Sequence, residues 1–274
     1  MTEPARNVVW IVSYPKSGNT WARFLVCNLV FGVQDSASAL NSMAPDIHEL
    51  SAMPELPGNT VFFKTHFPFS PALPFAQRTA AALYVVRDPA DVMLSNFHYS
   101  RRSGTTVTDD DLMRKQYVDQ YLAARGDPRW INMKIGSWDD HVRSWLGIRH
   151  PFPVLPIRYE DLLADGQQGA QRICAFLGLS RTAEEIAQAV EGASFRRMRE
   201  IEEADIRRRS VGIFYKPYLE QSIGGGLRFM RAGQAGEATR VLTAEQRRGV
   251  VSAFGPLMRE LGYGTGNDLS SSCR

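Results

Sequence analysis

Four short runs of apolar residues predict the strands of one sheet: VVWIVS (8–13), VFFK (61–64), AALYVV (81–86) and VLPIRY (154–159). Each run is almost continuously apolar, and segments with helical periodicity separate them. Strands of this kind belong to a mainly parallel sheet that helices cover on both faces. We therefore predict an α/β fold in three layers.

Capping signals mark several of the intervening helices. Asp88 and Pro89 are suited to the cap and the first position of a helix. Capping boxes open further helices at Thr182 and Thr243. The segment 36–57, rich in Ser, Ala, Met and Pro, is predicted to be irregular. The remaining predicted helices include 20–31, 137–146, 168–177 and the one that Gly262 ends.

Polar residues follow three of the predicted strands. Lys16 and Ser17 come after the first strand, His66 after the second, and Arg87 after the third, with Ser95 two helical turns later. Ligands bind at the carboxyl ends of the strands of a parallel sheet. These side chains are therefore expected to converge on one site.

The first of these connections joins a buried strand to the start of a helix. Backbone N–H groups at a helix start and the helix dipole stabilise an anion, and Gly18 allows a phosphate to approach closely. Lys16 adds a full positive charge. The segment is therefore a candidate phosphate-binding loop, with an ordinary polar turn as the alternative. Its other candidate donors are Ser17, Asn19 and Thr20.

This loop differs from the usual nucleotide-binding loop. The pattern GxxxxGK[ST] is absent, and Lys16 precedes Gly18 instead of following it. No acidic residue ends a strand where it would hold magnesium. These features disfavour an ATP-dependent small-molecule kinase, which remains an alternative.

Composition narrows the class of protein. The chain has 274 residues, 44% of them hydrophobic and 22% charged, which is typical of a soluble globular protein. We expect a single domain over residues 1–274. The net charge of +3 is too small to indicate a nucleic-acid partner. No apolar run is long enough to span a membrane.

The termini and the cysteines suggest a location. The first seven residues are polar and the apolar run after them is too short for a signal peptide. Cys27 and Cys174 lie in amphipathic helical patterns, and neither they nor Cys273 have a spacing typical of a zinc site. A cytoplasmic protein without a metal is therefore expected.

The segment YPKSGNTW, 14–21, resembles the 5'-phosphosulfate loop YPKSGTTW of the cytosolic-type sulfotransferases, with Asn19 in place of the first threonine. The resemblance implies a P-loop-NTPase-like fold and transfer of a sulfuryl group from 3'-phosphoadenosine-5'-phosphosulfate (PAPS) to a hydroxyl group. It also implies that Trp21 lies against the adenine. The residues that would hold the 5'-phosphate are Lys16, Ser17, Gly18, Asn19 and Thr20.

Two more motifs fit the same family. A lone histidine after a strand is more often packed or exposed than catalytic, but Lys64-Thr65-His66 resembles the KTH motif, which implies that His66 is the general base and that Lys64 assists with charge. The stretch 87–95 resembles the RxPxDxxxS motif of the 3'-phosphate site, so Arg87 and Ser95 are its expected ligands.

The expected mechanism assigns two further roles. Lys16 is expected to stabilise charge on the departing bridge oxygen, and Ser95 to restrain Lys16 until the acceptor arrives. A fixed lysine takes the place that magnesium has in kinases, so no metal is expected.

Later segments extend the resemblance as far as Gly262. Tyr159 matches a tyrosine close to the cofactor, and Phe195 would stack opposite Trp21. Arg231 and Gly233 match the RKGxxG loop over the 3'-phosphate. The chain departs from the family at Ala193, where threonine is usual, and at Ala232, where lysine is usual.

The acceptor is less well defined. The pairing of WIVSYPKSGNTW with GSWDDHVRSW resembles bacterial small-molecule sulfotransferases, including those that modify glycopeptide antibiotics. A hydroxylated secondary metabolite, phenol or lipid is expected, with a carbohydrate as the alternative. Residues 206–226 are expected to form a mobile lid. A homodimer and a non-catalytic nucleotide-binding regulator stay open. The expected walls of the acceptor pocket, or else core residues, are Phe67, Phe69, Phe97 and Tyr99.

Overall fold

The computed structural model describes residues 7–50, 59–104 and 111–264. Its centre is a parallel sheet of four strands in the order β2-β1-β3-β4. The chain passes from β1 to β2 on one side and then crosses to β3 on the other, which creates a switch point beside β1. The predicted α/β fold is confirmed. The strands are β1 (Val8–Ser13), β2 (Val61–Thr65), β3 (Thr79–Val86) and β4 (Val154–Arg158).

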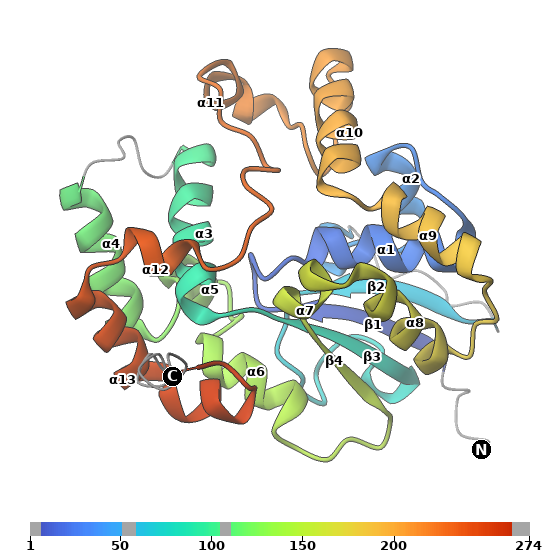
Figure 1. The fold of residues 1–274 in the computed structure, drawn as a ribbon, viewed down its shortest axis with the longest axis horizontal. Helices are drawn as coiled ribbons and strands as arrows, with labels where there is room; N and C mark the ends of the chain where they lie inside the picture. Colours follow the sequence, from blue (N-terminus) through green and yellow to red (C-terminus); the bar gives the residue numbers. More distant parts are fainter. Residues whose placement is uncertain (1–6, 51–58, 105–110, 265–274) are drawn as a thin grey trace, which may run out of the picture.

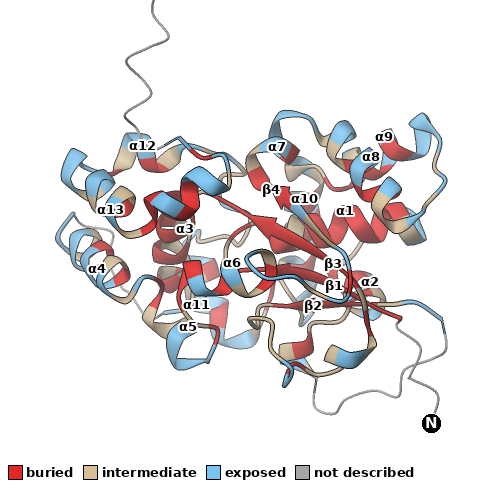
Figure 2. Ribbon diagram, turned by 90° about the horizontal axis from the view of Figure 1, so that it is seen from below, coloured by how far each residue is buried: buried red, intermediate tan, exposed pale blue. Residues whose placement is uncertain are grey.

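The strands separate two hydrophobic cores. Along β1, Trp10 and Val12 enter one core while Val9 and Ile11 enter the other, because successive strand residues point to opposite faces. Figure 2 shows the strands buried beneath the helices. On the second face lie α1 (Asn19–Phe31), α2 (Ala37–Met43), α8 (Gly166–Leu177), α9 (Ala183–Gly192) and α10 (Phe195–Arg208) (Figure 1).

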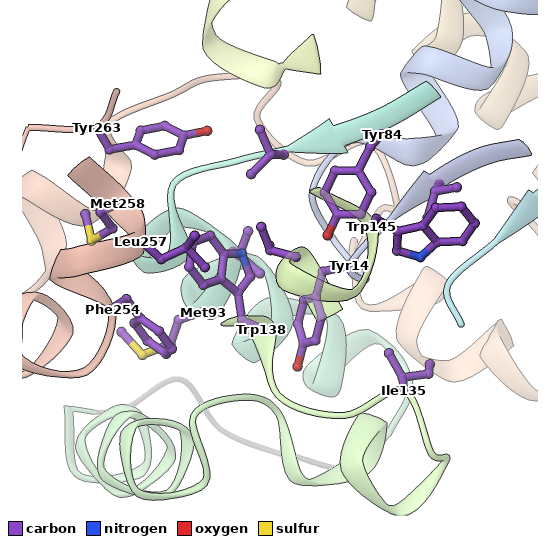
Figure 3. Close-up of a cluster of buried hydrophobic side chains, with 14 of the residues drawn as sticks. Tyr14, Tyr84, Met93, Ile135, Trp138, Trp145, Phe254, Leu257, Met258 and Tyr263 are labelled. Carbon is purple, nitrogen blue, oxygen red and sulfur yellow. The ribbon is translucent and has the colours of Figure 1, made fainter. Parts of the chain in front are cut away.

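Aromatic side chains fill much of the first core. Figure 3 shows Trp138 against Phe254, with ring centroids 5.3 Å apart. Tyr14, directly after β1, and Tyr84 of β3 are also completely buried there. This core joins the sheet to α3 (Pro89–Arg102), α4 (Asp111–Ala124), α6 (Trp138–Leu146), α12 (Glu237–Val241) and α13 (Ala244–Glu260). The other short helices are α5 (Pro128–Asn132), α7 (Tyr159–Ala164) and α11 (Glu220–Gly224), with 3-10 turns η1 (Ile47–Glu49), η2 (Ala76–Arg78) and η3 (Pro217–Leu219).

The prediction of an irregular segment over 36–57 was wrong for its first part, which forms α2 and η1. The Ser36 side chain caps α2 by accepting a hydrogen bond from the Ala39 N–H at 3.2 Å. Asp46 caps η1 by accepting from the His48 N–H at 3.0 Å. Residues 51–57 lie outside the described residues.

The other local predictions agree with the structure. Asp88 caps α3 with Pro89 in its first turn, and both capping boxes are present. Cys27 and Cys174 are buried free thiols, whereas Cys273 lies outside the described residues. Over the ranges that the structure describes, none of the helices has both the length and the apolar character to cross a membrane.

Candidate active site

A cavity of about 520 Å³ opens where the carboxyl ends of the strands meet residues 229–234. The structure brings the predicted site residues together around it, with one exception. Ser17 is buried outside the lining, and its hydroxyl has no partner among the described residues. The predicted residues in the lining are Lys16, Gly18, Asn19, Thr20, Trp21, Lys64, His66, Arg87, Ser95, Tyr159, Phe195, Arg231 and Gly233.

The first loop leaves the start of α1 without a side-chain cap. Gly18 occupies the cap position with φ 100°, a conformation that favours glycine. A Cβ on Gly18 would lie 2.6 Å from the Tyr159 ring, so the ring packs directly on the loop. The uncapped start of α1 lies at the cavity end that Lys16 and Thr20 line. This arrangement is suited to an anion.

The side chain of Asn19 contacts the sheet. Its side-chain amide donates to the Ile11 carbonyl at 3.2 Å, and the residue is buried. The amide therefore ties the loop to β1. The loop's other donors to an anion are its backbone N–H groups and Thr20.

Lys16 places its ammonium between two aromatic rings. Its Nζ atom lies 4.4 Å from the Tyr99 ring centre and 4.3 Å from that of Phe229. Burial, together with the positive charges of Arg102 and Arg87, lowers the Lys16 pKa to about 7. No hydrogen bond joins Lys16 to Ser95 in the described chain, so the two rings hold the ammonium in this structure.

His66 has a defined tautomer. Its Nδ1 atom is 2.7 Å from the Ser13 carbonyl oxygen, which only accepts hydrogen bonds. Nδ1 therefore carries the proton, and Nε2 keeps its lone pair. Burial lowers the His66 pKa well below its usual range, and the charges of Lys64 and His48 lower it further. His66 is thus a neutral histidine at the cavity wall.

Lys64 is not an isolated charge. Its Nζ atom forms an ion pair with Asp46 at 2.7 Å, and both side chains are largely buried. Burial lowers the Lys64 pKa, and Asp46 opposes that effect. Asp46 and His48 also line the cavity and were missed in the sequence, because no motif marks the segment that carries them.

Arg87, directly after β3, contacts the segment 231–236. Its Nη2 atom donates to the Gln234 carbonyl at 2.7 Å and lies 3.3 Å from Asp91. The guanidinium covers the Tyr159 ring, 4.3 Å from its centre. Asp91 also accepts a hydrogen bond from the N–H of Gly236, in the same segment, at 2.7 Å. These contacts hold Arg87 beside the segment that carries Arg231.

Two aromatic rings border the part of the cavity expected for adenine. A Cβ on Gly233, whose φ is 61°, would lie 2.3 Å from the Phe195 ring, so only glycine fits there. Trp21 contacts Tyr159 edge-on, with ring centres 5.2 Å apart. Arg231 pairs with Glu237 through both guanidinium Nη atoms.

The remaining wall of the cavity is mainly apolar. Of the four aromatic residues that were expected there, only Tyr99 lines it. Phe97 is completely buried in the protein, and Phe69 packs against Trp145 and Phe152. The lining residues that sequence reasoning missed here are Trp130, Met133 and Ile135, whereas Ile213, Tyr218 and Leu219 belong to the segment 206–226 that was expected beside the acceptor.

The expected lid, 206–226, borders the cavity through this wall. The Arg102 guanidinium donates to the Phe214 carbonyl at 2.6 Å, and Lys216 forms an ion pair with Glu49 at 2.7 Å. The segment is therefore attached to α3 and η1. Within 7–50, 59–104 and 111–264, no three His, Cys, Asp or Glu residues are grouped to hold a metal ion.

Comparisons with known sequences give a consistent result. A family model described as the sulfotransferase domain matches residues 6–262. The guinea pig 3-alpha-hydroxysteroid sulfotransferase is 29% identical over 199 residues, covering 70% of this chain and 66% of the relative. Human sulfotransferase 2B1 is 29% identical, with 70% of this chain and 52% of the relative covered. The chain thus spans between about half and two thirds of these relatives.

Solved structures share the fold. Mouse sulfotransferase SULT7A1, complexed with PAP (adenosine 3',5'-bisphosphate), has a TM-score of 0.66 at 23% identity, with 96% of this chain and 86% of that one covered. Retinol dehydratase, in complex with androsterone and the inactive cofactor PAP, has a TM-score of 0.65 at 20% identity, with 93% and 82% covered. The match of the family model over nearly the whole chain, on this fold, shows that the protein belongs to the sulfotransferase family.

Proposed function

We propose that this sulfotransferase moves the sulfuryl group of PAPS to a hydroxyl group of a largely apolar small molecule. The observation that carries the proposal is one cavity with two anion-binding ends, at Lys16 and at Arg87, and a neutral histidine on its wall. PAPS has phosphates at both ends of its adenosine. Arg87 and Ser95, with Arg231 and Gly233, would hold the 3'-phosphate.

The transfer needs position and charge more than covalent help from the protein. The Nε2 atom of His66 accepts the proton of the attacking hydroxyl, whose oxygen bonds to sulfur as the bridging S–O bond breaks. Lys16 stabilises the negative charge on the departing oxygen, and Lys64 lies beside the transferring group. The start of α1 holds the 5'-phosphate, with Thr20 as an additional donor.

The adenine ring would lie between the rings of Trp21 and Phe195. Both residues line the cavity, and Tyr159 supports Trp21 and the loop at Gly18. Asn19 supports the loop from within through its hydrogen bond to the Ile11 carbonyl. The small residue Ala193 stands where the family usually has threonine, so the rings carry more of this recognition.

The walls of the acceptor part favour an apolar hydroxylated molecule. Trp130, Met133 and Tyr218 offer a large contact surface to a phenol, a lipid or a secondary metabolite. The names of the similar proteins point the same way, since they include steroid sulfotransferases and a retinol dehydratase bound to androsterone. We extend the proposal to a bacterial, cytoplasmic enzyme with one domain over 1–274, a mobile 206–226 segment and, as an assembly, a homodimer.

Calorimetric titration separates this function from the kinase alternative. PAP should bind in the presence of EDTA, and ATP with magnesium should bind at least about 100-fold more weakly, because ATP lacks the 3'-phosphate. Labelled PAPS with a panel of phenols, steroids and sugars then identifies the acceptor class. ATP binding as tight as that of PAP would favour the kinase, and PAP binding without turnover on any acceptor would favour the regulator.

A further inference from the structure

His48 contacts the backbone of His66 from a segment that no motif marks. The His66 N–H donates to the Nε2 atom of His48 at 2.8 Å. His66 follows the last residue of β2, so its N–H falls beyond the described pairing of β2 with β1. The His48 ring also lies against Phe67, with ring centres 4.1 Å apart. His48 thus satisfies a backbone donor at the point where the chain leaves the sheet.

Asp46 fixes the turn that carries His48. One carboxylate oxygen accepts from the His48 N–H at 3.0 Å, and the other pairs with the Lys64 ammonium at 2.7 Å. The Lys64 N–H donates to the Pro45 carbonyl at 2.9 Å. One turn therefore holds both Lys64 and His66, which are two residues apart on the neighbouring segment.

The other side of the His66 peptide is held as well. The Nε2–H group of His141 donates to the His66 carbonyl at 3.0 Å, and the Tyr84 hydroxyl donates to Nδ1 of His141 at 2.7 Å. The His66 ring itself is fixed by Ser13. The ring and the carbonyl thus have their own partners, and the contact from His48 is the hydrogen bond that holds the His66 N–H.

We propose that His48, anchored by Asp46, is a positioning residue that aims Nε2 of His66 at the acceptor hydroxyl. This inference rests on the proposed function, in which His66 is the base. His48 acts through the hydrogen bond that its Nε2 accepts. A base that is misplaced by about 1 Å loses about 100-fold in rate, so a weaker restraint is expressed in kcat.

Two substitutions separate the hydrogen bond from the ring. His48→Phe keeps an aromatic ring against Phe67 and removes the acceptor, whereas His48→Gln keeps an acceptor near the Nε2 position and removes the ring. His48→Phe should lower kcat by about 10- to 100-fold with little change in the affinity for PAP, and His48→Gln should stay within about threefold of the wild type. His150→Phe is the matched control, since His150 bonds to the Trp145 carbonyl away from the cavity.

A second readout does not depend on turnover. Nitrogen-15 NMR of the five histidines in the PAP complex reports which ring nitrogen of His66 carries the proton. The wild type and His48→Gln should show one tautomer, protonated at Nδ1, and His48→Phe should show a mixture, because the less restrained His66 backbone no longer keeps the ring against the Ser13 carbonyl. If the wild type binds PAP but sulfates no acceptor, the proposed function fails while this spectrum still tests the positioning role.

Three results would overturn the inference. The first is a wild-type kcat with an unchanged His66 spectrum in His48→Phe. The second is an equal loss of kcat in His48→Phe and His48→Gln. The third is a loss of PAP affinity in His48→Phe without a loss of kcat. Thermal unfolding of both variants verifies that each is folded. If His48→Phe does not fold, a kcat of His48→Gln more than about threefold below that of the wild type would overturn the inference.

Discussion

Replacing Gly18 with alanine tests how the phosphate loop is built. An alanine at φ 100° is strained, because side chains other than that of glycine rarely adopt this conformation. Its Cβ would also lie 2.6 Å from the Tyr159 ring, where an ordinary contact is about 3.5–4 Å. Tyr159 is buried, so the ring has little room to move. The loop and the ring must therefore separate by about 1 Å.

The two effects can be given magnitudes. The backbone strain costs about 1–2 kcal/mol, and a forced overlap in a packed site costs about 1–3 kcal/mol. A total of at least about 2 kcal/mol, if it is expressed in binding, corresponds to about 30-fold weaker affinity for PAP. The same cost, if expressed in folding, lowers the free energy of unfolding.

Gly178→Ala provides the control, since Gly178 has φ 68° and no atom lies within 4 Å of the position that a Cβ would take there. It carries the backbone strain alone and lies at the end of α8. Calorimetry with PAP and urea unfolding should show wild-type affinity and a loss of about 1 kcal/mol for Gly178→Ala. If Gly18→Ala binds PAP within twofold of the wild type and unfolds like the control, the packing of Tyr159 on a phosphate loop is refuted.

Three further predictions concern titratable groups. His66→Ala should lower kcat by about 10²–10⁴-fold and leave PAP affinity nearly intact, and full activity in that variant would remove His66 from the mechanism. The Lys16 pKa is about 7, so Lys16 is largely neutral at pH 8, and PAP binding at that pH should take up close to one proton. Calorimetry in two buffers measures this uptake, and Lys16→Met should abolish it. Equal uptake in both proteins would contradict this assignment. Burial lowers the pKa of His48 to about 4 and of His141 to about 3. Below pH 6.5 the unfolded chain therefore binds protons that the folded protein does not. The free energy of unfolding should then fall by about 1.4 kcal/mol per pH unit for each histidine as the pH is lowered. Stability that stays constant between pH 6.5 and 5 would argue against these two buried, neutral rings.

The sheet and the ends of its strands could be predicted because the signals are local. Four apolar runs mark strands that are buried on both faces, and the polar residues after them face one edge by the geometry of a parallel sheet. Lys16, His66 and Arg87 therefore reach the same cavity, as the order of motifs indicated. α2 was missed because it is short and contains several alanines and serines that also suit an irregular connection.

Contacts across the fold were beyond a reading of the sequence. The pairing of Asp46 with Lys64 joins segments 18 residues apart, and the Lys16 ammonium meets Phe229, more than two hundred residues away. Neither partner has a local pattern that marks it. The side chain of Asn19 illustrates the same limit, since its bond to Ile11 depends on how α1 packs against β1.

A crystal structure with bound PAP would show directly whether both phosphates lie where the two ends of the cavity indicate. We predict the 5'-phosphate at the start of α1, within hydrogen-bonding distance of Lys16, and the 3'-phosphate on Arg87 and Ser95. A nucleotide bound in the opposite direction, or one that leaves either Lys16 or Arg87 without a phosphate, would contradict this prediction.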